Sequence, residues 1–168
     1  VTVQTKENGV TYVTQKDDKQ EDGFARNKNN EILNEHPDDT GVTITSGGEK
    51  TSNTITVETA KDQTTDVTLE NVHIEVNTTD AKSGAIEING DGDTNLELNG
   101  NNTVLTENLW REGHAAIEKA DKYGKEGTLT IKDDLNDDGS EKTGTKADTT
   151  GTLLAGGDLM AAAIGGGN

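Results

Sequence analysis

The feature that most constrains this chain is a set of three interleaved series of apolar residues with one shared period near 30. The series are Ile55, Ile86 and Ile117; Leu69, Leu98 and Leu129; and Ile44, Ile74 and Leu105. Three series with one period predict a solenoid, in which each coil contributes three strands that stack on their counterparts about 4.8 Å away. We therefore expect an all-β chain of stacked parallel strands.

The local sequence around these residues is typical of half-buried strands. Segments such as 42–45, 54–57 and 85–88 alternate apolar with polar residues and are rich in Val, Ile and Thr, while Gly, Asn and Asp lie between them. Val, Ile, Leu and Phe together make up only 31 of the 168 residues, which by composition alone indicates disorder. The long period argues against disorder, because a coil of a solenoid buries its apolar face only against its neighbours.

The same spacing locates an insertion near the end of the chain. Ile117 is followed by the next Ala-Ile cluster at Ile164, 47 residues later, and Leu105 is followed by Leu153, 48 residues later. The second series shows no such excess up to its last member. The additional residues are therefore expected in the segment 132–150, between two strands of the last coil.

A second long segment, 16–41, precedes the first regular coil. We expect one β-helical unit over residues 1–168, with N-terminal strands and a long loop in 1–41 and regular coils in 42–168. If Val13 belongs to the second series, both insertions leave the same corner of the solenoid.

Charge and composition exclude several classes of partner. With 15 Lys and Arg against 32 Asp and Glu, the net charge is −17, which repels nucleic acid and anionic membranes. The lack of cysteine excludes a disulfide framework and a thiolate metal site. No apolar run is long enough for a signal peptide or a membrane span, so any signal or anchor is expected outside these 168 residues.

The run from Asp66 to Asn168 resembles a known family. The matching phrases are VTLENVHIEV (67–76), SGAIEING (83–90), LELNGNNTVL (96–105), GHAAIEKA (113–120), GTLTIKD (127–133) and AAAIGGGN (161–168). They resemble the β-helical carbohydrate-binding-domain proteins of gut and cellulolytic Gram-positive bacteria. The resemblance implies a right-handed parallel β-helix of about four coils on the bacterial cell surface, which binds polysaccharide or acts in adhesion, often with calcium. The matched phrases contain no catalytic motif, so no catalytic residue is implied.

Two acidic clusters are candidate calcium ligands. Asp134, Asn136 and Asp138 fit the opening D-x-[DN]-x-[DN]-G of a calcium loop, although the closing Glu of that loop is missing. Asp91 and Asp93 alternate with Gly between two strands. The alternative interpretations are a solvated acidic loop for the first cluster and ordinary turn chemistry for the second.

The candidate ligand-binding residues are Trp110, Arg111, His114 and Tyr123. An exposed Trp beside an Arg is suited to stack on a sugar ring and to hydrogen-bond its hydroxyls. The alternative is that Trp110 covers an open edge of a thin core.

Together these features predict an extracellular, non-catalytic surface module that binds a polysaccharide or a host or cell-wall glycan with the help of Ca²⁺. The first alternative is a structural spacer that projects other domains. The second is a polysaccharide lyase or hydrolase, which the scattered His and Arg residues disfavour. The unpaired strands of the last coil also predict end-to-end association.

Overall fold

The computed structural model describes residues 1–14, 25–26, 36–38, 42–77, 83–107, 113–119, 127–133, 151–157 and 161–166. These residues form strands and turns, with no helix among them, so the all-β prediction is confirmed. None of the described residues belongs to a helix of the length and hydrophobicity that a membrane crossing requires.

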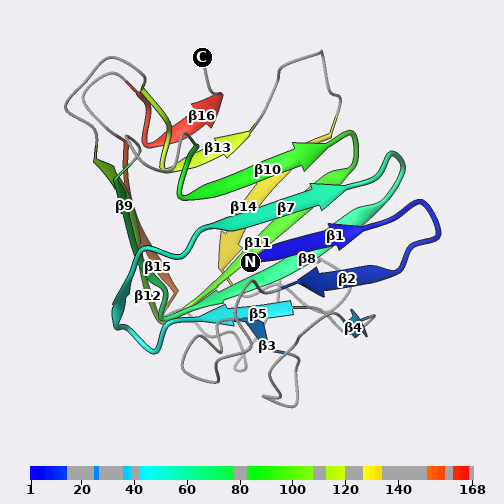
Figure 1. Ribbon diagram of the computed structural model, residues 1–168, viewed down its shortest axis with the longest axis horizontal. Coiled ribbons are helices and arrows are strands. Elements are labelled where there is room, and N and C mark those ends of the chain that lie inside the picture. Colours follow the sequence, from blue (N-terminus) through cyan, green and yellow to red (C-terminus); the bar gives the residue numbers. More distant parts are fainter. Residues whose placement is uncertain are drawn as a thin grey trace.

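The strands form three sheets (Figure 1). Sheet 1 has the order β16 (Ile164–Gly166), β13 (Ile117–Lys119), β10 (Ile86–Gly90), β7 (Ile55–Thr59), β1 (Thr2–Thr5), β2 (Thr11–Thr14), β4 (His36–Asp38). Sheet 2 has the order β14 (Leu129–Asp133), β11 (Asp93–Asn99), β8 (Thr64–Glu70), β5 (Val42–Thr45), β3 (Ala25–Arg26). Sheet 3 has the order β15 (Thr152–Gly156), β12 (Asn101–Glu107), β9 (His73–Asn77), β6 (Lys50–Thr51).

From β5 onward the chain visits the three sheets in one order, sheet 2, sheet 3 and then sheet 1, four times in succession. From β8 onward, each strand pairs in parallel with the strand of the preceding turn in the same sheet. This arrangement is solenoid-like. Each turn buries its apolar residues against the turns on either side.

The N-terminal strands extend the stack differently. β1 pairs in parallel with β7, but β2 pairs antiparallel with β1, and β4 antiparallel with β2. In sheet 2, β3 pairs antiparallel with β5. Val13 lies in β2, opposite Val3, and therefore in sheet 1. The premise that Val13 belongs to the second series is wrong, and the expectation of a shared corner for the two insertions loses its basis.

The first predicted series is confirmed as an in-register ladder of isoleucines in sheet 1. Ile55 pairs with Ile86, Ile86 with Ile117, and Ile117 with Ile164. The first three side chains are completely buried, whereas Ile164, on the last strand, is 43% exposed. Full burial of one such side chain stabilises the fold by about 1.5–3 kcal/mol.

The second series is confirmed at one step and wrong at the next. Leu69 pairs with Leu98, but Leu98 pairs with Asp133, and Leu129 pairs with Thr94. The chain from Leu98 to its partner Asp133 is longer than one period of about 30 residues. A charged residue, and not a leucine, therefore occupies the next position of the ladder. The assumption that the ladder continues with leucine therefore misplaced the register.

The third series is wrong at both ends. Ile44 pairs with Leu69 and so lies in sheet 2. Ile74 pairs with Val104, while Leu105 pairs with Glu75 and belongs to the outer face of sheet 3. Side chains alternate between the two faces of a strand, so an error of one residue exchanges the inside for the outside. The long connection does fall between β14 and β15, but residues 134–150 lie outside the described part of the chain.

A chain of buried hydroxyls joins sheets 1 and 2 at their corner. Oγ1–Oγ1 distances are 3.1 Å for Thr94–Thr59, 2.7 Å for Thr59–Thr65, 2.6 Å for Thr65–Thr5 and 2.8 Å for Thr5–Thr11. Thr65 donates to Thr5, and because a hydroxyl has one hydrogen, Thr59 donates to Thr65 and Thr94 donates to Thr59, while either Thr5 or Thr11 is the donor in the last bond. The chain links the β1–β2 hairpin to the core without leaving a buried hydroxyl unpaired.

Candidate functional site

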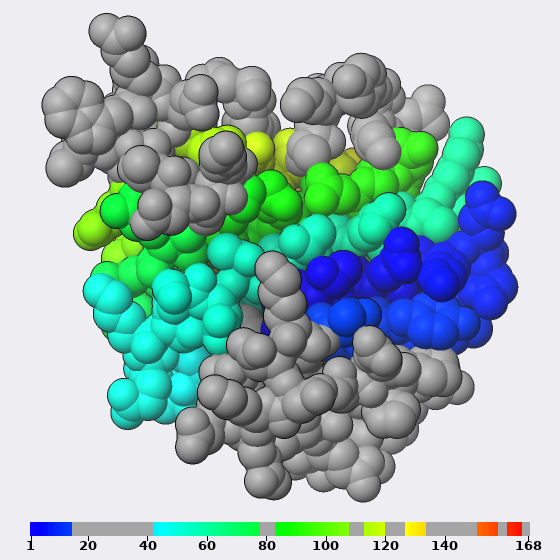
Figure 2. Space-filling model, in the orientation of Figure 1, coloured from blue at the N-terminus to red at the C-terminus, as the bar shows by residue number. Residues whose placement is uncertain are grey.

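The outer face of sheet 1 carries a straight row of polar and aromatic side chains across four adjacent strands. Tyr12 on β2 lies opposite Gln4 on β1, Gln4 lies beside Glu58 on β7, and Glu58 lies beside Asn89 on β10. Their sequence neighbours Val13, Val3, Val57 and Ile88 are completely buried, so alternation places the four side chains on the outer face. Figure 2 shows the strands that carry this row lying side by side.

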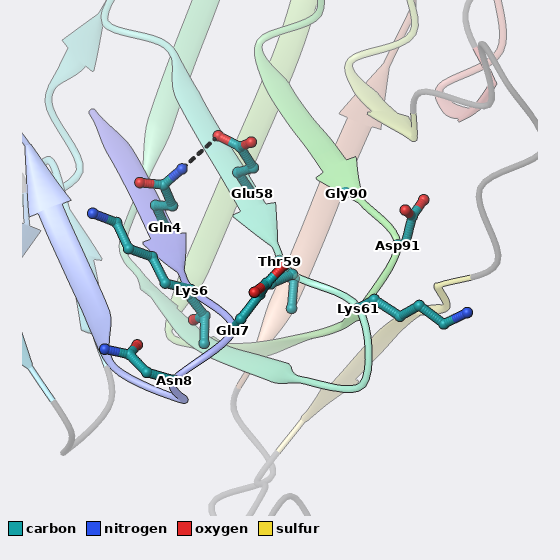
Figure 3. A pocket seen from close by; sticks show the side chains of 11 residues that line it. Gln4, Lys6, Glu7, Asn8, Glu58, Thr59, Lys61, Gly90 and Asp91 are labelled. Atoms are coloured by element: carbon teal, nitrogen blue, oxygen red, sulfur yellow. Dashed lines mark hydrogen bonds between the residues drawn. The ribbon is translucent and has the colours of Figure 1, made fainter.

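The row is fixed in part by its own hydrogen bond. Gln4 Nε2 donates to Glu58 Oε2 at 3.0 Å (Figure 3). Tyr12 is half-buried, and the Lys6 ammonium lies 4.4 Å from its ring centroid, a cation–π distance. The outer face therefore presents an aromatic ring, two amides and a carboxylate at regular intervals of about 4.8 Å.

A hollow of about 610 Å³ adjoins the row (Figure 3). Three segments form it: the end of β1 with its turn, the end of β7 with its turn, and the end of β10. The lining residues are Gln4, Thr5, Lys6, Glu7, Asn8, Glu58, Thr59, Ala60, Lys61, Gly90 and Asp91. Most of these side chains are hydrogen-bond donors or acceptors, so the hollow is suited to a ligand rich in hydroxyl or amide groups.

The backbone at the hollow is shaped by Gly90. Its φ of 93° lies in the left-handed region, and a Cβ at this position would overlap the carbonyl oxygen of Thr59. Two residues later, the Gly92 N–H donates to that same carbonyl at 3.1 Å. Thr59 and Gly90 both line the hollow, and only glycine permits this close approach of the two strand ends.

A second group of titratable side chains lies on the same face of sheet 1. Glu87 on β10 pairs in register with Glu118 on β13, and His114 Nδ1 lies 2.9 Å from Glu118 Oε2. Burial and the Glu118 carboxylate raise the pKa of Glu87 above its usual value, and His114 partly opposes the rise. The hydroxyl of Thr106 donates to the His114 carbonyl at 2.9 Å and fixes the segment that carries the imidazole.

The structure places some of the predicted ligand-binding and metal-binding residues. His114 is on the outer face of sheet 1, next to Glu118, and Asp91 lines the hollow. Asp93 Oδ1 accepts hydrogen bonds of 2.8 Å from both the backbone N–H and the hydroxyl of Thr128, and these bonds lower the pKa of Asp93. Asp93 is the first residue of β11 and thus holds the start of β14 against β11, its neighbour in sheet 2.

The remaining candidates lie outside the described residues: Trp110, Arg111, Tyr123, Asp134, Asn136 and Asp138. Within the described ranges, no group of three or more His, Asp or Glu side chains is arranged to hold a metal ion.

Sequence reasoning missed the row and most of the hollow, although one signal for it was present. Asn8-Gly9 separates two alternating segments and is a strong indicator of a two-stranded hairpin. Gly9 has a φ of 77°, and the turn is closed by the Gly9 N–H, which donates to the Lys6 carbonyl at 2.9 Å. A hairpin drawn from this signal places Gln4 near Tyr12.

Comparison of the chain with protein-family models, with curated proteins and with solved structures finds no match.

Proposed function

We propose that this chain is an extracellular, non-catalytic surface module that binds polysaccharide on the outer face of sheet 1, carried by a right-handed parallel β-helix. The main support for the proposal is the row formed by Tyr12, Gln4, Glu58 and Asn89, which lies beside a polar hollow. Sugars present apolar ring faces and many hydroxyls. An aromatic ring next to amide and carboxylate groups complements both.

The rigidity of the face supports binding over a purely structural role. The row lies on strands, its hairpin is tied to the core by the threonine chain, and Gln4 is already bonded to Glu58. Side chains held in place lose little conformational freedom when a ligand arrives, which favours affinity. A spacer has no need of such an arrangement on one face.

The experiment is retention of the protein by a panel of immobilised neutral and acidic polysaccharides, measured by affinity electrophoresis. We expect Tyr12→Ala and Gln4→Ala to lose most of the retention. Asn95→Ala is the matched control, because Asn95 Nδ2 donates to Asp66 Oδ1 at 2.8 Å in an equivalent exposed pair on sheet 2. If no polysaccharide retains the protein, or if all three variants behave alike, the proposal is wrong and the spacer alternative takes its place.

Polysaccharide hydrolysis is the second candidate function, favoured by the adjacent carboxylates of Glu87 and Glu118. Glycosidases use two carboxyl groups, one of which has a raised pKa and acts as general acid. Release of reducing ends from the polysaccharides that bind distinguishes the two functions: steady release that Glu87→Gln abolishes would make the chain an enzyme.

Calcium assistance remains part of the proposal and concerns Asp134, Asn136 and Asp138. A cation that binds the folded state stabilises it by RT ln(1 + [L]/Kd), which is about 2.7 kcal/mol at a hundredfold excess. Thermal unfolding in calcium and in excess chelator, at constant ionic strength, tests this. A rise in Tm that Asp134→Ala and Asp138→Ala remove supports calcium binding, and an unchanged Tm rejects it.

A further inference from the structure

Three asparagines of this chain, Asn8, Asn89 and Asn99, are each followed by glycine. Asparagine is chemically labile in this setting, because the backbone nitrogen of the next residue can attack its amide carbon and glycine has no side chain to hinder the approach. The three pairs share one local chemistry, so a difference in their reactivity must come from the fold. Asn8 lies in the turn between β1 and β2, whereas Asn89 and Asn99 belong to β10 and β11.

We propose that Asn8 is a site of spontaneous deamidation in the folded protein, while Asn89 and Asn99 are protected. The Gly9 nitrogen bonds to Cγ of Asn8, the Cγ–Nδ2 bond breaks, and ammonia leaves with the hydrogen of the Gly9 N–H. Water then opens the cyclic imide at either carbonyl, which gives aspartate or isoaspartate. Water is the only co-reactant, and nothing is oxidised or reduced. The inference is independent of the proposed function, because it concerns the chemistry of one turn.

The turn activates the side-chain amide of Asn8 for this attack (Figure 3). The Val10 N–H donates to Oδ1 of Asn8 at 3.1 Å. This bond polarises the amide and stabilises the negative charge that develops on Oδ1 when the Gly9 nitrogen adds to Cγ. Asn8 and Gly9 are both exposed, so water reaches the imide once it has formed.

Ring closure also needs a rotation of the backbone between Asn8 and Gly9, and the turn allows it without disturbing the sheet. The rotation breaks the 2.9 Å hydrogen bond from the Gly9 N–H to the Lys6 carbonyl. The register of β1 with β2 is set by other pairs, from Thr2 with Thr14 to Thr5 with Thr11. Opening of an exposed turn is a local fluctuation of low free energy, so the reactive conformation is populated in the native state.

Asn99 lacks this freedom because its amide and its carbonyl are both held by neighbours. Its carbonyl accepts hydrogen bonds from the Asn71 N–H at 3.1 Å and from Asn102 Nδ2 at 3.2 Å. Its own Nδ2 donates to Glu70 Oε2 at 3.3 Å. The rotation that brings the Gly100 nitrogen to Cγ breaks the two bonds to the carbonyl, so the reaction requires opening of the corner between sheets 2 and 3.

Asn89 is restrained by the ladder of sheet 1. It pairs in register with Glu58 of β7, and the following Gly90 pairs with Thr59. Rotation between Asn89 and Gly90 separates the end of β10 from β7 at the point where the two backbones approach most closely. The reactive conformation at Asn89 therefore needs a larger opening than at Asn8.

Deamidation at Asn8 changes the charge of the hollow. Asn8 lines the hollow together with Glu7 and Lys6. Aspartate at this position adds a carboxylate beside these two charges, and isoaspartate also lengthens the backbone of the turn. Modified molecules therefore form a more acidic fraction of the protein.

The test is incubation of the purified protein at mildly alkaline pH, followed by tryptic peptide mapping with mass spectrometry. Trypsin places Asn8 in peptide 7–16 and the other two sites in peptide 83–111, where fragmentation distinguishes them. The mass change from amide to acid reports deamidation, and labelling by isoaspartate methyltransferase reports the isoaspartate product. We expect the extent of reaction in the folded protein to be about tenfold greater, or more, at Asn8 than at Asn89 or Asn99.

The same protein unfolded in urea is the matched control, because all three pairs are then free to rotate and should react at similar rates. Asn8→Gln should remove the early acidic fraction seen by ion-exchange chromatography of the folded protein. Equal extents at the three sites in the folded protein, or a faster reaction at Asn89 or Asn99, would overturn the inference. So would an unmodified Asn8 under conditions in which the unfolded chain reacts.

Discussion

Gln4 and Glu58, 54 residues apart in the sequence, are joined by a hydrogen bond of 3.0 Å between adjacent strands of sheet 1. The bond joins the N-terminal hairpin to the stack, and the hairpin contributes one half of the row on the outer face of sheet 1. The β1–β2 hairpin supplies Tyr12 and Gln4, while regular turns of the repeat supply Glu58 and Asn89. A binding role for this face therefore requires the hairpin to be docked on β7.

The threonine chain at the corner should be essential for that docking. Thr59 bonds to both Thr65 and Thr94 in a completely buried position, so Thr59→Val leaves two hydroxyls with one partner fewer. We expect a loss of about 1–3 kcal/mol in the free energy of unfolding, measured in urea. Thr56→Val, on the outer face of the same strand, is the control and should change it by less than about 0.5 kcal/mol. Equal losses would contradict the role of the chain.

The close approach of Gly90 to the Thr59 carbonyl predicts that the free energy of unfolding is unusually sensitive to substitution at Gly90. Gly90→Ala combines a φ of 93° with overlap on the Thr59 carbonyl, and should cost more than about 2 kcal/mol. Gly48 has a similar φ of 82° and nothing near its added Cβ, so Gly48→Ala should cost only about 1 kcal/mol. Thermal denaturation of the two variants separates steric overlap from backbone strain. Similar Tm values would argue that strain alone matters.

The isoleucine ladder predicts a gradient of stability along the stack. Ile117→Ala removes a completely buried side chain and should destabilise the protein by about 2–5 kcal/mol. Ile164→Ala, at the next step of the same ladder, should cost about 1 kcal/mol because Ile164 is already 43% exposed. Chemical denaturation measures both. An equal cost would mean that the last strand is covered in solution.

The raised pKa of Glu87 predicts how stability depends on pH. A carboxyl group whose pKa is higher in the folded state favours folding when protonated, so its contribution is lost as pH rises from the unfolded toward the folded pKa. Glu87→Gln should therefore stabilise the protein at pH 7, by about 0.5 kcal/mol after allowance for solvent screening. The gain should vanish near pH 4. Urea midpoints at both pH values check the sign, and a gain only at low pH would refute it.

The ladder of sheet 1 was predictable because its first two steps are each 31 residues long and the Ala-Ile pair recurs at 85–86, 116–117 and 163–164. Glu87 and Glu118 each follow an isoleucine of this ladder and have the same spacing of 31 residues. Their pairing could therefore also be predicted from the sequence. The third series failed because Val104 and Leu105 are both apolar, and periodicity alone does not choose between neighbours. Packing in the folded protein decides which of the two faces the core, and Val104 is the residue that is buried. The row remained hidden because two of its members belong to a hairpin outside the repeat.

The two ends of the stack differ in a way that limits how copies could assemble. At the N-terminal end, antiparallel pairs add β2 and β4 to sheet 1 and β3 to sheet 2, while no described strand pairs with the outer edges of β14, β15 and β16. Head-to-tail joining would need a matching parallel edge at both ends and would produce an open filament. Sheet 2 ends in β3, which runs antiparallel to β5, so the two edges of this sheet do not match. A copy that continued the parallel stack at this end would therefore meet a mismatched edge in sheet 2.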